Sequence, residues 1–338
     1  MEFAFTKDQR LFQESFRDML QAECPPTMVR EAWENDTGRA PGLWSKLAGL
    51  GLTGMLVDPE HGGLGMDELD FILLLEESGR FALPEPLLGA AFIAPPLIRA
   101  LASEDQARRW LPAMASGDLV PAVGLDFSRK VQDAGTADLL IMQKGSEFHA
   151  LERSDYSVEA QASVDRSRMV CHVSWAPGPK TLLLRDTDVL IHSAAAFNRG
   201  ALGTSAQLIG LARHLIDMTV EYAGARTQFG VPIGSFQAVK HQLADAHLAV
   251  EFARPMVYRA AWSMARDKGD TETHVSMAKV YAAEAALKTA KAALQIHGAI
   301  GYSFEHDLHL WMKRVWALAS DWGDAAWHRQ RVGQAVLG

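Results

Sequence analysis

Two short stretches of the sequence place polar side chains beside glycines, and these residues are the most able to hold a ligand. The first, Ala225–Phe236, has the sequence Ala-Arg-Thr-Gln-Phe-Gly-Val-Pro-Ile-Gly-Ser-Phe and is followed by Gln237. It connects two long helical patterns, and Ser235 is expected to cap the second of them. An arginine, a glutamine and a phenylalanine on so short a connection can present a cation, an amide and a ring to one ligand. The alternative is an ordinary helix–helix corner with a solvated Arg226 and a packed Phe229.

The second stretch is Leu294–Asp307, with the sequence Leu-Gln-Ile-His-Gly-Ala-Ile-Gly-Tyr-Ser-Phe-Glu-His-Asp. Gly298 and Gly301 permit positive φ angles and the close approach of a ligand to the backbone. Gln295 and His297 could then offer side chains beside exposed amides. The alternative for this stretch is a glycine that simply ends a helix.

Hydrophobic periodicity predicts a mainly α protein in three sections. Residues 1–117 form a helical domain, in which Thr6 and Ser103 are expected as N-caps. Residues 118–192 form a small, reduced β domain, and residues 193–338 form a four-helix bundle. The two polar stretches are therefore expected at connections of the bundle.

The β domain is predicted from short apolar runs that are bounded by turn residues. The expected strand-like stretches are Asp118–Phe127, Ala137–Met142, Met169–Trp175 and Thr181–Ile191.

Composition limits the classes of function. The 338 residues are 48% hydrophobic and 22% charged, with a net charge of −8. This negative charge argues against a general nucleic-acid binder. Cys24 and Cys171 match no metal-binding or redox spacing, so we expect no metal site. The sequence starts without a signal peptide and has no apolar run that spans a bilayer, so a cytoplasmic protein without membrane insertion is expected.

Three segments in this order resemble the acyl-CoA dehydrogenase family. Leu52–Met66 together with Leu74–Arg80 is similar to an N-terminal signature of the family. Arg226–Gly230 followed by Ser235–Gln237 is similar to its arginine loop, and Gln295–Gly301 is similar to its glycine turn. The resemblance covers nearly the whole chain and implies an acyl-CoA dehydrogenase-like fold.

Members of that family carry FAD, and one subunit completes the FAD site of its neighbour. The resemblance implies that two sets of residues contact the adenosine-diphosphate half of a FAD that is bound mainly by another subunit. They are Arg226, Gln228, Phe229 and Gln237 in the arginine loop, and Gln295, Gly298 and Ala299 in the glycine turn. Ala299 stands where the family usually has a second glycine.

The family's catalytic base is missing from both of its usual positions. These enzymes remove the α-proton of an acyl-CoA with a glutamate, and Trp322 occupies its place in Ser320–Asp324. Gly200 occupies the alternative position in the first bundle helix. Asp321 is the neighbouring carboxylate, but one residue on a helix turns a side chain away by about 100°.

The β section also departs from the family. Ala122–Ser128 matches the segment that wraps the flavin ring, but the stretch after it is shortened, and Trp175 is the aromatic that could take the place of the family's later tryptophan. The adenosine-contacting half therefore looks intact while the flavin half looks impaired.

A missing base together with the segment Glu305–Leu310 resembles the partner subunits of heteromeric acyl-CoA dehydrogenases, including those of bacterial steroid side-chain degradation. The resemblance implies an acyl-CoA substrate, a catalytic dehydrogenase subunit in an α2β2 assembly, and an electron acceptor such as an electron-transfer flavoprotein. Two alternatives remain open. One is a self-associating, self-sufficient dehydrogenase that uses Asp321 or another carboxylate as a non-standard base, and the other is an acyl-CoA-binding or scaffold protein that has lost FAD.

Overall fold

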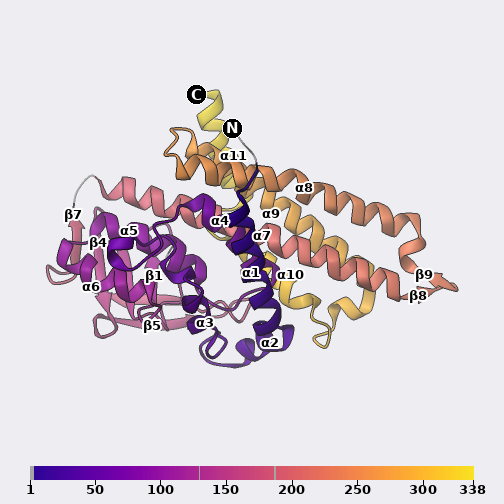
Figure 1. Ribbon diagram of the computed structural model, residues 1–338. Helices are drawn as coiled ribbons and strands as arrows, with labels where there is room; N and C mark the ends of the chain where they lie inside the picture. The colour runs from indigo at the N-terminus through magenta and orange to yellow at the C-terminus, as the bar shows by residue number, and fades with distance from the viewer. Residues whose placement is uncertain (1–3, 129, 186–187) are drawn as a thin grey trace. The chain divides into compact units, whose positions relative to one another are not determined.

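The computed structural model describes residues 4–128, 130–185 and 188–338 (Figure 1). The chain divides into two compact units. The first comprises the described residues of Met1–Thr27, Ile72–Leu83 and Ala201–Gly338, and the second comprises those of Met28–Phe71 and Pro84–Gly200. The domain limits expected near residues 117 and 192 remain predictions.

The first unit is built from long helices, in which α9 packs against α8, α10 and α11. Helices α8 and α9 run side by side to the end of the unit that carries the small hairpin of β8 and β9 (Figure 1). The mainly α architecture is confirmed, and α11 extends it beyond the four expected bundle helices. The helices are α1 (Lys7–Glu23), α8 (Gln237–Ala265), α9 (Thr271–His297), α10 (Leu308–Ser320) and α11 (Ala325–Leu337), with parts of α4 (Glu68–Arg80) and α7 (Val189–Ala225).

Capping boxes start two of the helices, as the sequence predicts. The Thr6 hydroxyl accepts the Gln9 backbone N–H at 3.2 Å, and the Gln9 side chain accepts the Thr6 N–H at 2.9 Å. Ser103 and Gln106 form the same reciprocal pair at the start of α6 (Glu104–Ala115). Each box satisfies two N–H groups that have no partner within the helix.

Small residues allow close packing within the first unit. A Cβ atom on Gly210 would lie 1.8 Å from the Glu76 carbonyl oxygen, and one on Gly79 would lie 2.1 Å from the Gln207 carbonyl oxygen. Only glycine permits α4 and α7 to approach this closely. Buried alanines have the same effect along α9, where they are Ala278, Ala282, Ala283, Ala285, Ala286, Ala290 and Ala293.

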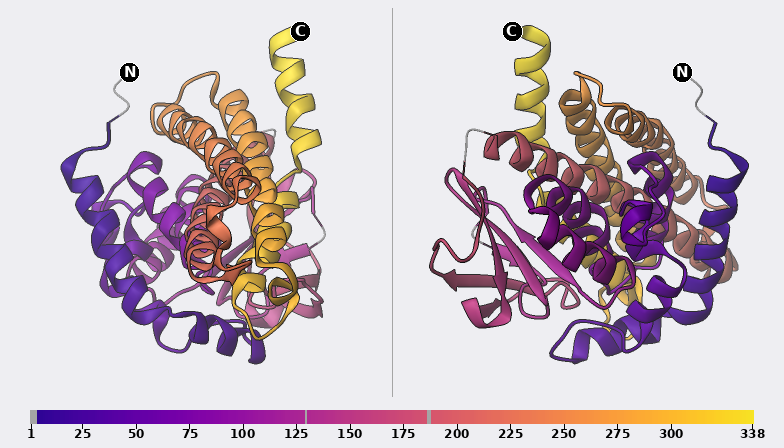
Figure 2. Two further views of the ribbon diagram at one scale, coloured as in Figure 1. Left: turned by 90° about the vertical axis from the view of Figure 1, so that its right-hand side faces the viewer. Right: turned by 60° about the vertical axis from the view of Figure 1, so that its left-hand side comes forward.

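The second unit combines short helices with two sheets (Figure 2). One sheet has the strand order β1-β3-β4-β7, in which β1 and β3 are parallel, and the other has the antiparallel order β2-β6-β5. The strands are β1 (Pro121–Gly124), β2 (Lys130–Gln132), β3 (Leu139–Lys144), β4 (Glu147–Glu152), β5 (Tyr156–Gln161), β6 (Val170–Trp175) and β7 (Leu182–Arg185). The helices are α2 (Pro26–Glu34), α3 (Leu43–Gly49), α5 (Ala94–Leu101) and α6, with the π-helix η3 (Leu88–Ile93) before α5.

A continuous apolar core fills the β section and includes Val131, Leu140, Leu151 and Cys171. The short predicted strands are thus parts of two regular sheets. The strand-like stretch predicted over Thr181–Ile191 was wrong at its end, because α7 already begins at Val189. Val189 is buried while Leu190 and Ile191 are exposed, and a short apolar run of this kind does not distinguish a strand from the first turn of a helix.

Candidate functional site

The arginine loop is a tight hairpin at the C-terminal end of α7. Strands β8 (Thr227–Gln228) and β9 (Val231–Pro232) pair, and the two turn residues Phe229 and Gly230 have φ angles of +52° and +80°. Two positive φ values mark a type I′ turn, which usually takes asparagine and glycine. The Phe229 ring is 94% exposed despite this unfavourable backbone conformation.

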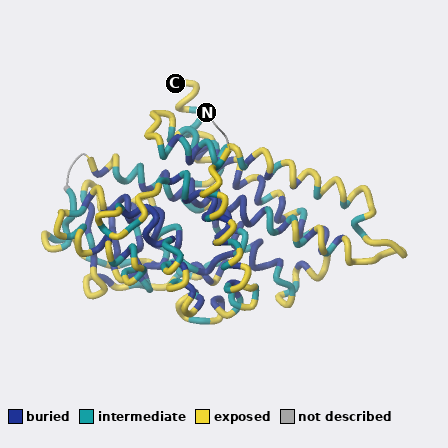
Figure 3. The backbone as a smooth tube through the Cα atoms, viewed as in Figure 1, coloured by how far each residue is buried: buried dark blue, intermediate teal, exposed yellow. Residues whose placement is uncertain are grey.

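Polar groups of the loop also face solvent. Arg226, Gln228 and Gln237 are exposed, and Figure 3 shows this end of the bundle as an exposed segment. The Arg226 backbone is fixed, since its N–H donates to the Tyr222 carbonyl and its carbonyl accepts the Ile233 N–H, both at 2.8 Å. The backbone from which the guanidinium extends is therefore ordered.

The predicted cap at Ser235 was wrong. Its hydroxyl donates back to the Pro232 carbonyl at 2.7 Å, because residues 233–235 form a short 3-10 turn. Helix α8 starts from Phe236, which provides no side-chain cap in the described structure.

The glycine turn follows α9. Gly298 has φ +63° and ψ −138°, a conformation essentially restricted to glycine. A Cβ atom there would meet no described atom within 4 Å, so the conformation, and not crowding, requires glycine. Gln295, Gly298 and Ala299 are all exposed, and the chain continues as the 3-10 segment η6 (Gly298–Tyr302).

Direct contacts bring the arginine loop and the glycine turn together. The Tyr222 hydroxyl, in the last turn of α7, donates to the His297 carbonyl at 3.3 Å. Their rings stack with centroids 4.3 Å apart, and His306 packs edge-on against His297 at 4.9 Å. Burial lowers the pKa of His297, whose Nδ1 donates to the Ala293 carbonyl. The residues expected to contact the adenosine-diphosphate group thus lie at one end of the first unit.

The turn after α10 stands where the family that the sequence resembles has its catalytic base. Two buried side chains hold this turn. Trp322 and Gly323 have φ angles of +52° and +86°. The fully buried Lys279 ammonium donates to the Ala319 and Gly323 carbonyls at 3.0 and 2.9 Å. His328 Nε2 donates to the Trp322 carbonyl at 2.8 Å. We call Lys279 and His328 the turn clamp.

The histidine that holds this turn is a weak base. Burial lowers the pKa of His328 to about 4, and the positive charge of Lys279 adds to this shift. Asp321 is the C-cap residue of α10 and is partly exposed. Gly200 is buried in the part of α7 that belongs to the second unit. A base role for Asp321 stays a prediction.

The segment Ala122–Ser128, which the sequence resemblance predicts to wrap the flavin ring, lies in the second unit. Phe127 is about half exposed and packs edge-on against Phe197, with ring centroids 4.9 Å apart. Trp175 lies at the end of β6 with its ring 5.0 Å from that of His149, which is buried between Glu147 and Thr181. Trp175 is therefore part of the packing around His149.

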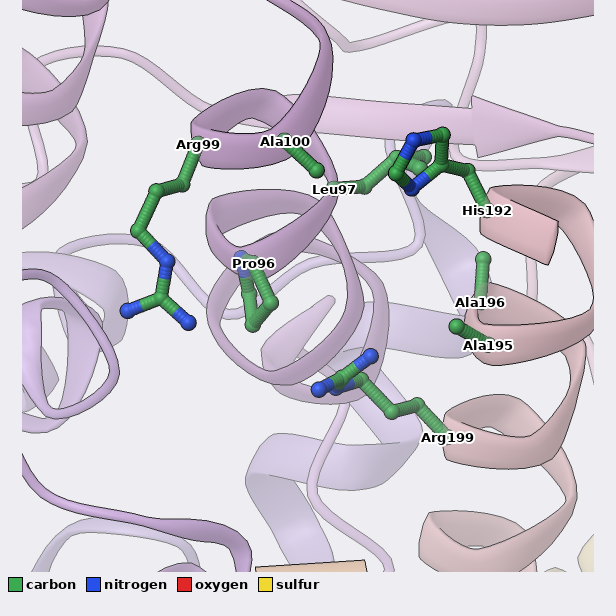
Figure 4. Close-up of a pocket in the computed structure, with 8 residues that line it drawn as sticks. All are labelled: Pro96, Leu97, Arg99, Ala100, His192, Ala195, Ala196 and Arg199. Atoms are coloured by element: carbon green, nitrogen blue, oxygen red, sulfur yellow. The ribbon is translucent and has the colours of Figure 1, made fainter. Parts of the chain in front are cut away.

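A hollow of about 280 Å³ between α5 and the start of α7 is lined by small apolar residues and three basic side chains (Figure 4). Arg99 pairs with Asp58 at 3.0 Å, and Arg199 pairs with Glu68 at 2.6 Å. Because both guanidinium charges are already matched by carboxylates, we assign no ligand to this hollow.

The described part of the chain contains neither a metal-binding cluster nor a membrane-spanning helix. Among the described residues, no cluster of three or more His, Cys, Asp or Glu side chains could hold a metal ion. In the same part of the chain, no helix combines the length and the apolar character needed to cross a membrane.

Comparison with known proteins identifies the family of this chain. Residues 6–118 match the model "Acyl-CoA dehydrogenase, N-terminal domain", and residues 192–337 match "Acyl-CoA dehydrogenase, C-terminal domain". Acyl-CoA dehydrogenase IpdE2 of Mycobacterium tuberculosis is 30% identical over 310 residues, which cover 91% of each chain. The human mitochondrial short-chain specific acyl-CoA dehydrogenase is 28% identical over 77% of this chain and 74% of its own length.

Solved structures share the fold. The ChsE4-ChsE5 complex from Mycobacterium tuberculosis matches with a TM-score of 0.89 and 23% identity, over 100% of this chain and 99% of the matched chain. Butyryl-CoA dehydrogenase from Megasphaera elsdenii matches with a TM-score of 0.88 and 22% identity over both complete chains. The chain therefore belongs to the acyl-CoA dehydrogenase family, whose members are FAD-dependent oxidoreductases.

Proposed function

We propose that this chain is the subunit of a heteromeric acyl-CoA dehydrogenase that completes the adenosine-diphosphate half of a FAD site on a catalytic partner subunit. The observation that carries the proposal is a division within the first unit. One end presents ordered, exposed cofactor-binding groups, while the turn that should supply a base presents Trp322, held by the turn clamp.

The residues present fit the adenosine-diphosphate group. Arg226 offers an exposed guanidinium on an ordered backbone, which suits a pyrophosphate, and Phe229 offers an exposed ring that suits the face of adenine. Gly298 leaves open space at the glycine turn, where backbone amides can approach a ribose or phosphate. Gln228, Gln237, Gln295 and Ala299 would complete this surface.

The strained conformation of Phe229 supports the proposal. A large ring placed at a positive φ and left 94% exposed destabilises the isolated chain. Such a residue is explained if the ring is covered in an assembly. When bound, FAD supplies the two-electron acceptor for α,β-dehydrogenation of an acyl-CoA thioester.

Each protein of the assembly has a distinct role in the proposal. This chain's residues bind and orient the adenosine end, and the catalytic subunit supplies the α-proton acceptor. ChsE4-ChsE5 is a two-protein complex with the same fold. Electrons then pass to an acceptor such as an electron-transfer flavoprotein.

The test is to purify the chain alone and together with a candidate catalytic subunit, and to measure flavin absorbance and acyl-CoA oxidation. We expect flavin and turnover only in the complex, with one FAD for each pair of unlike subunits. Stoichiometric FAD and full turnover by the lone chain would overturn the proposal. In that case Asp321→Asn tests the self-sufficient enzyme, and flavin in neither sample favours a binding or scaffold protein.

Arg226→Ala in the complex tests the proposed contact of the Arg226 guanidinium with the pyrophosphate of FAD. Loss of a charge-assisted hydrogen bond weakens binding by about 1.5–3 kcal/mol, or roughly 10- to 150-fold in the dissociation constant of FAD. Arg266→Ala is the matched control, because Arg266 is exposed at the opposite end of α8. Equal effects of the two substitutions would contradict the assigned role.

A further inference from the structure

The imidazole of His306 holds the start of α10 beside the glycine turn. The first helical residue of α10 is Leu308, and its backbone N–H donates to His306 Nδ1 at 3.1 Å. Asp307, the N-cap residue, forms no side-chain cap bond in the described structure. Leu308 is fully buried, so its N–H would be costly to leave without this acceptor. The His306 ring therefore takes the place of a side-chain cap.

Leu308 in turn packs against the glycine turn. A Cβ atom added to Gly301 would lie 3.2 Å from Leu308 Cδ2 and 3.0 Å from His297 Cβ, so both side chains pack directly on this glycine. The His306 ring packs edge-on against the His297 ring, and its centroid lies 6.3 Å from that of Tyr222. A displacement of His306 and Leu308 would therefore also displace the glycine turn.

The bond to Leu308 requires a neutral His306. An imidazole nitrogen accepts an N–H bond only when it carries no proton, and both nitrogens of an imidazolium are donors. A cation at this position would also stand at the N-terminal end of α10, where the aligned backbone dipoles favour negative charge. His306 is only half-buried, so protons from solvent can reach it. Histidine is the side chain whose charge ordinarily changes in the physiological pH range.

Two rings from other helices pack against His306. From α9, His297 resists a second charge, because burial lowers its pKa and a charge on His306 adds to this shift against the bond to a backbone carbonyl. From α7, Tyr222 contributes its ring. Neither residue offers a carboxylate to a protonated His306. Its acidic neighbours in the chain are Glu305 and Asp307.

The titratable groups that α10 contributes contact Phe304. Lys313 Nζ lies 4.1 Å from the centroid of the Phe304 ring, and His309 Nε2 lies 3.3 Å from the Phe304 carbonyl oxygen. The bond of His309 survives protonation, because its Nε2 is a donor toward a carbonyl. The bond that His306 makes with Leu308 does not. His306 is thus the group whose charge decides whether α10 keeps its cap.

We propose that His306 is a proton-sensitive positioning residue, which holds the glycine turn for the adenosine-diphosphate half of FAD when neutral and loosens it when protonated. This inference rests on the proposed function, since it concerns the regulation of the same site. Protonation removes the acceptor of the Leu308 N–H, so that Leu308 no longer holds Gly301 in place. A loosened turn must be ordered again when FAD binds, and this ordering weakens binding.

The first test measures the dissociation constant of FAD from the assembled complex by flavin fluorescence, at about pH 7.5 and about pH 5.5. For the wild type we expect binding to be roughly 3- to 10-fold weaker at the lower pH, as for the loss of one hydrogen bond. His306→Asn should bind equally at the two pH values, because an asparagine side chain accepts the N–H two residues on and does not titrate.

Two further variants sharpen this test. His306→Phe keeps an aromatic ring but offers Leu308 no acceptor, so we expect weaker binding than the wild type at about pH 7.5 and no change with pH. His247→Asn is the matched control, since His247 is an exposed histidine of α8 in the same unit. It should keep the pH ratio of the wild type. A wild type without a pH ratio, or an undiminished ratio in His306→Asn, would overturn the inference.

A measurement on the chain alone separates this inference from the proposed function. If the complex binds no FAD, the proposed function fails, and hydrogen exchange of the backbone amides is compared at the same two pH values after correction for intrinsic exchange. Loss of protection at residues 298–310 of the wild type at the lower pH, absent from His306→Asn, supports the role of His306 independently of FAD. Equal protection of the wild type at both pH values rejects it.

Discussion

The Tyr222 hydroxyl donates to the His297 carbonyl, and the two rings stack 4.3 Å apart at an angle of 20°. This contact joins the end of α7 to the end of α9. It fixes the arginine loop and the glycine turn with respect to each other, so that both can face one ligand.

Removing the Tyr222 ring should loosen both turns. Tyr222→Phe removes one hydrogen bond and keeps the stack, so we expect a loss of about 0.5–1.5 kcal/mol in the free energy of unfolding. Tyr222→Ala also removes the ring, and about 3–5 kcal/mol is expected. Urea unfolding measures both. Similar losses for the two variants would mean that the stack contributes little.

A substitution of Phe229 should affect the stability of the chain and its binding of FAD in different ways. Because asparagine tolerates a positive φ better than phenylalanine, Phe229→Asn should leave stability unchanged or raise it by about 0.5–1 kcal/mol. The same substitution should weaken FAD binding to the complex roughly 5- to 20-fold through loss of stacking area. Thermal unfolding and flavin fluorescence measure the two effects. Unweakened FAD binding would remove Phe229 from the proposed site.

Gly298 tests the backbone requirement of the glycine turn. Gly298→Ala should destabilise the chain by about 1–3 kcal/mol, although the space for a methyl group is open, because φ +63° with ψ −138° strains any L-residue. Ala299→Gly serves as the neighbouring control and should cost less than about 1 kcal/mol. If both variants unfold at the same urea concentration, the strain argument fails.

Lys279 should hold the turn at Trp322. Lys279→Met leaves the Ala319 and Gly323 carbonyls without their donor, and each unsatisfied buried group costs about 1–3 kcal/mol. We expect lower stability and faster proteolysis at the turn. Lys288→Met, on the same helix but exposed, should behave as the wild type. A turn that stays protected in Lys279→Met would show that His328 suffices.

Glu85 makes stability depend on pH. Its pKa is about 7 in the folded chain and has its ordinary value of 4.5 in the unfolded chain. The folded state therefore keeps the proton to higher pH, so its stabilising contribution is complete below about pH 4.5 and is lost as the pH rises through 7. Relative to Glu85→Gln, the wild type should lose about 1–3 kcal/mol between pH 4.5 and 8. Parallel pH profiles of the two proteins would contradict this assignment.

Local sequence signals predicted much of the fold. The capping boxes at Thr6 and Ser103 depend on residues three positions apart, and the helices follow from apolar periodicity, so the sequence alone reveals them. The turn at Gly298 was predictable for the same reason. A local prediction can still be wrong when a side chain has two possible hydrogen-bond partners. The Ser235 hydroxyl was expected to cap α8, but it donates to the Pro232 carbonyl instead.

The contacts that define the candidate sites needed the tertiary structure. Tyr222 and His297 are 75 residues apart, and Lys279 and Gly323 are 44 apart. Such pairs meet only when whole helices pack, and packing depends on the combined burial of many side chains. By itself, the sequence predicted the family, the two glycine-containing turns that we propose bind the cofactor, and Trp322 and Gly200 at the positions where the family has its base. Only the folded chain decided that these turns share one end of a bundle, and that the half-buried residues Arg39 and Glu85 each keep buried side-chain atoms without a hydrogen-bond partner among the described residues.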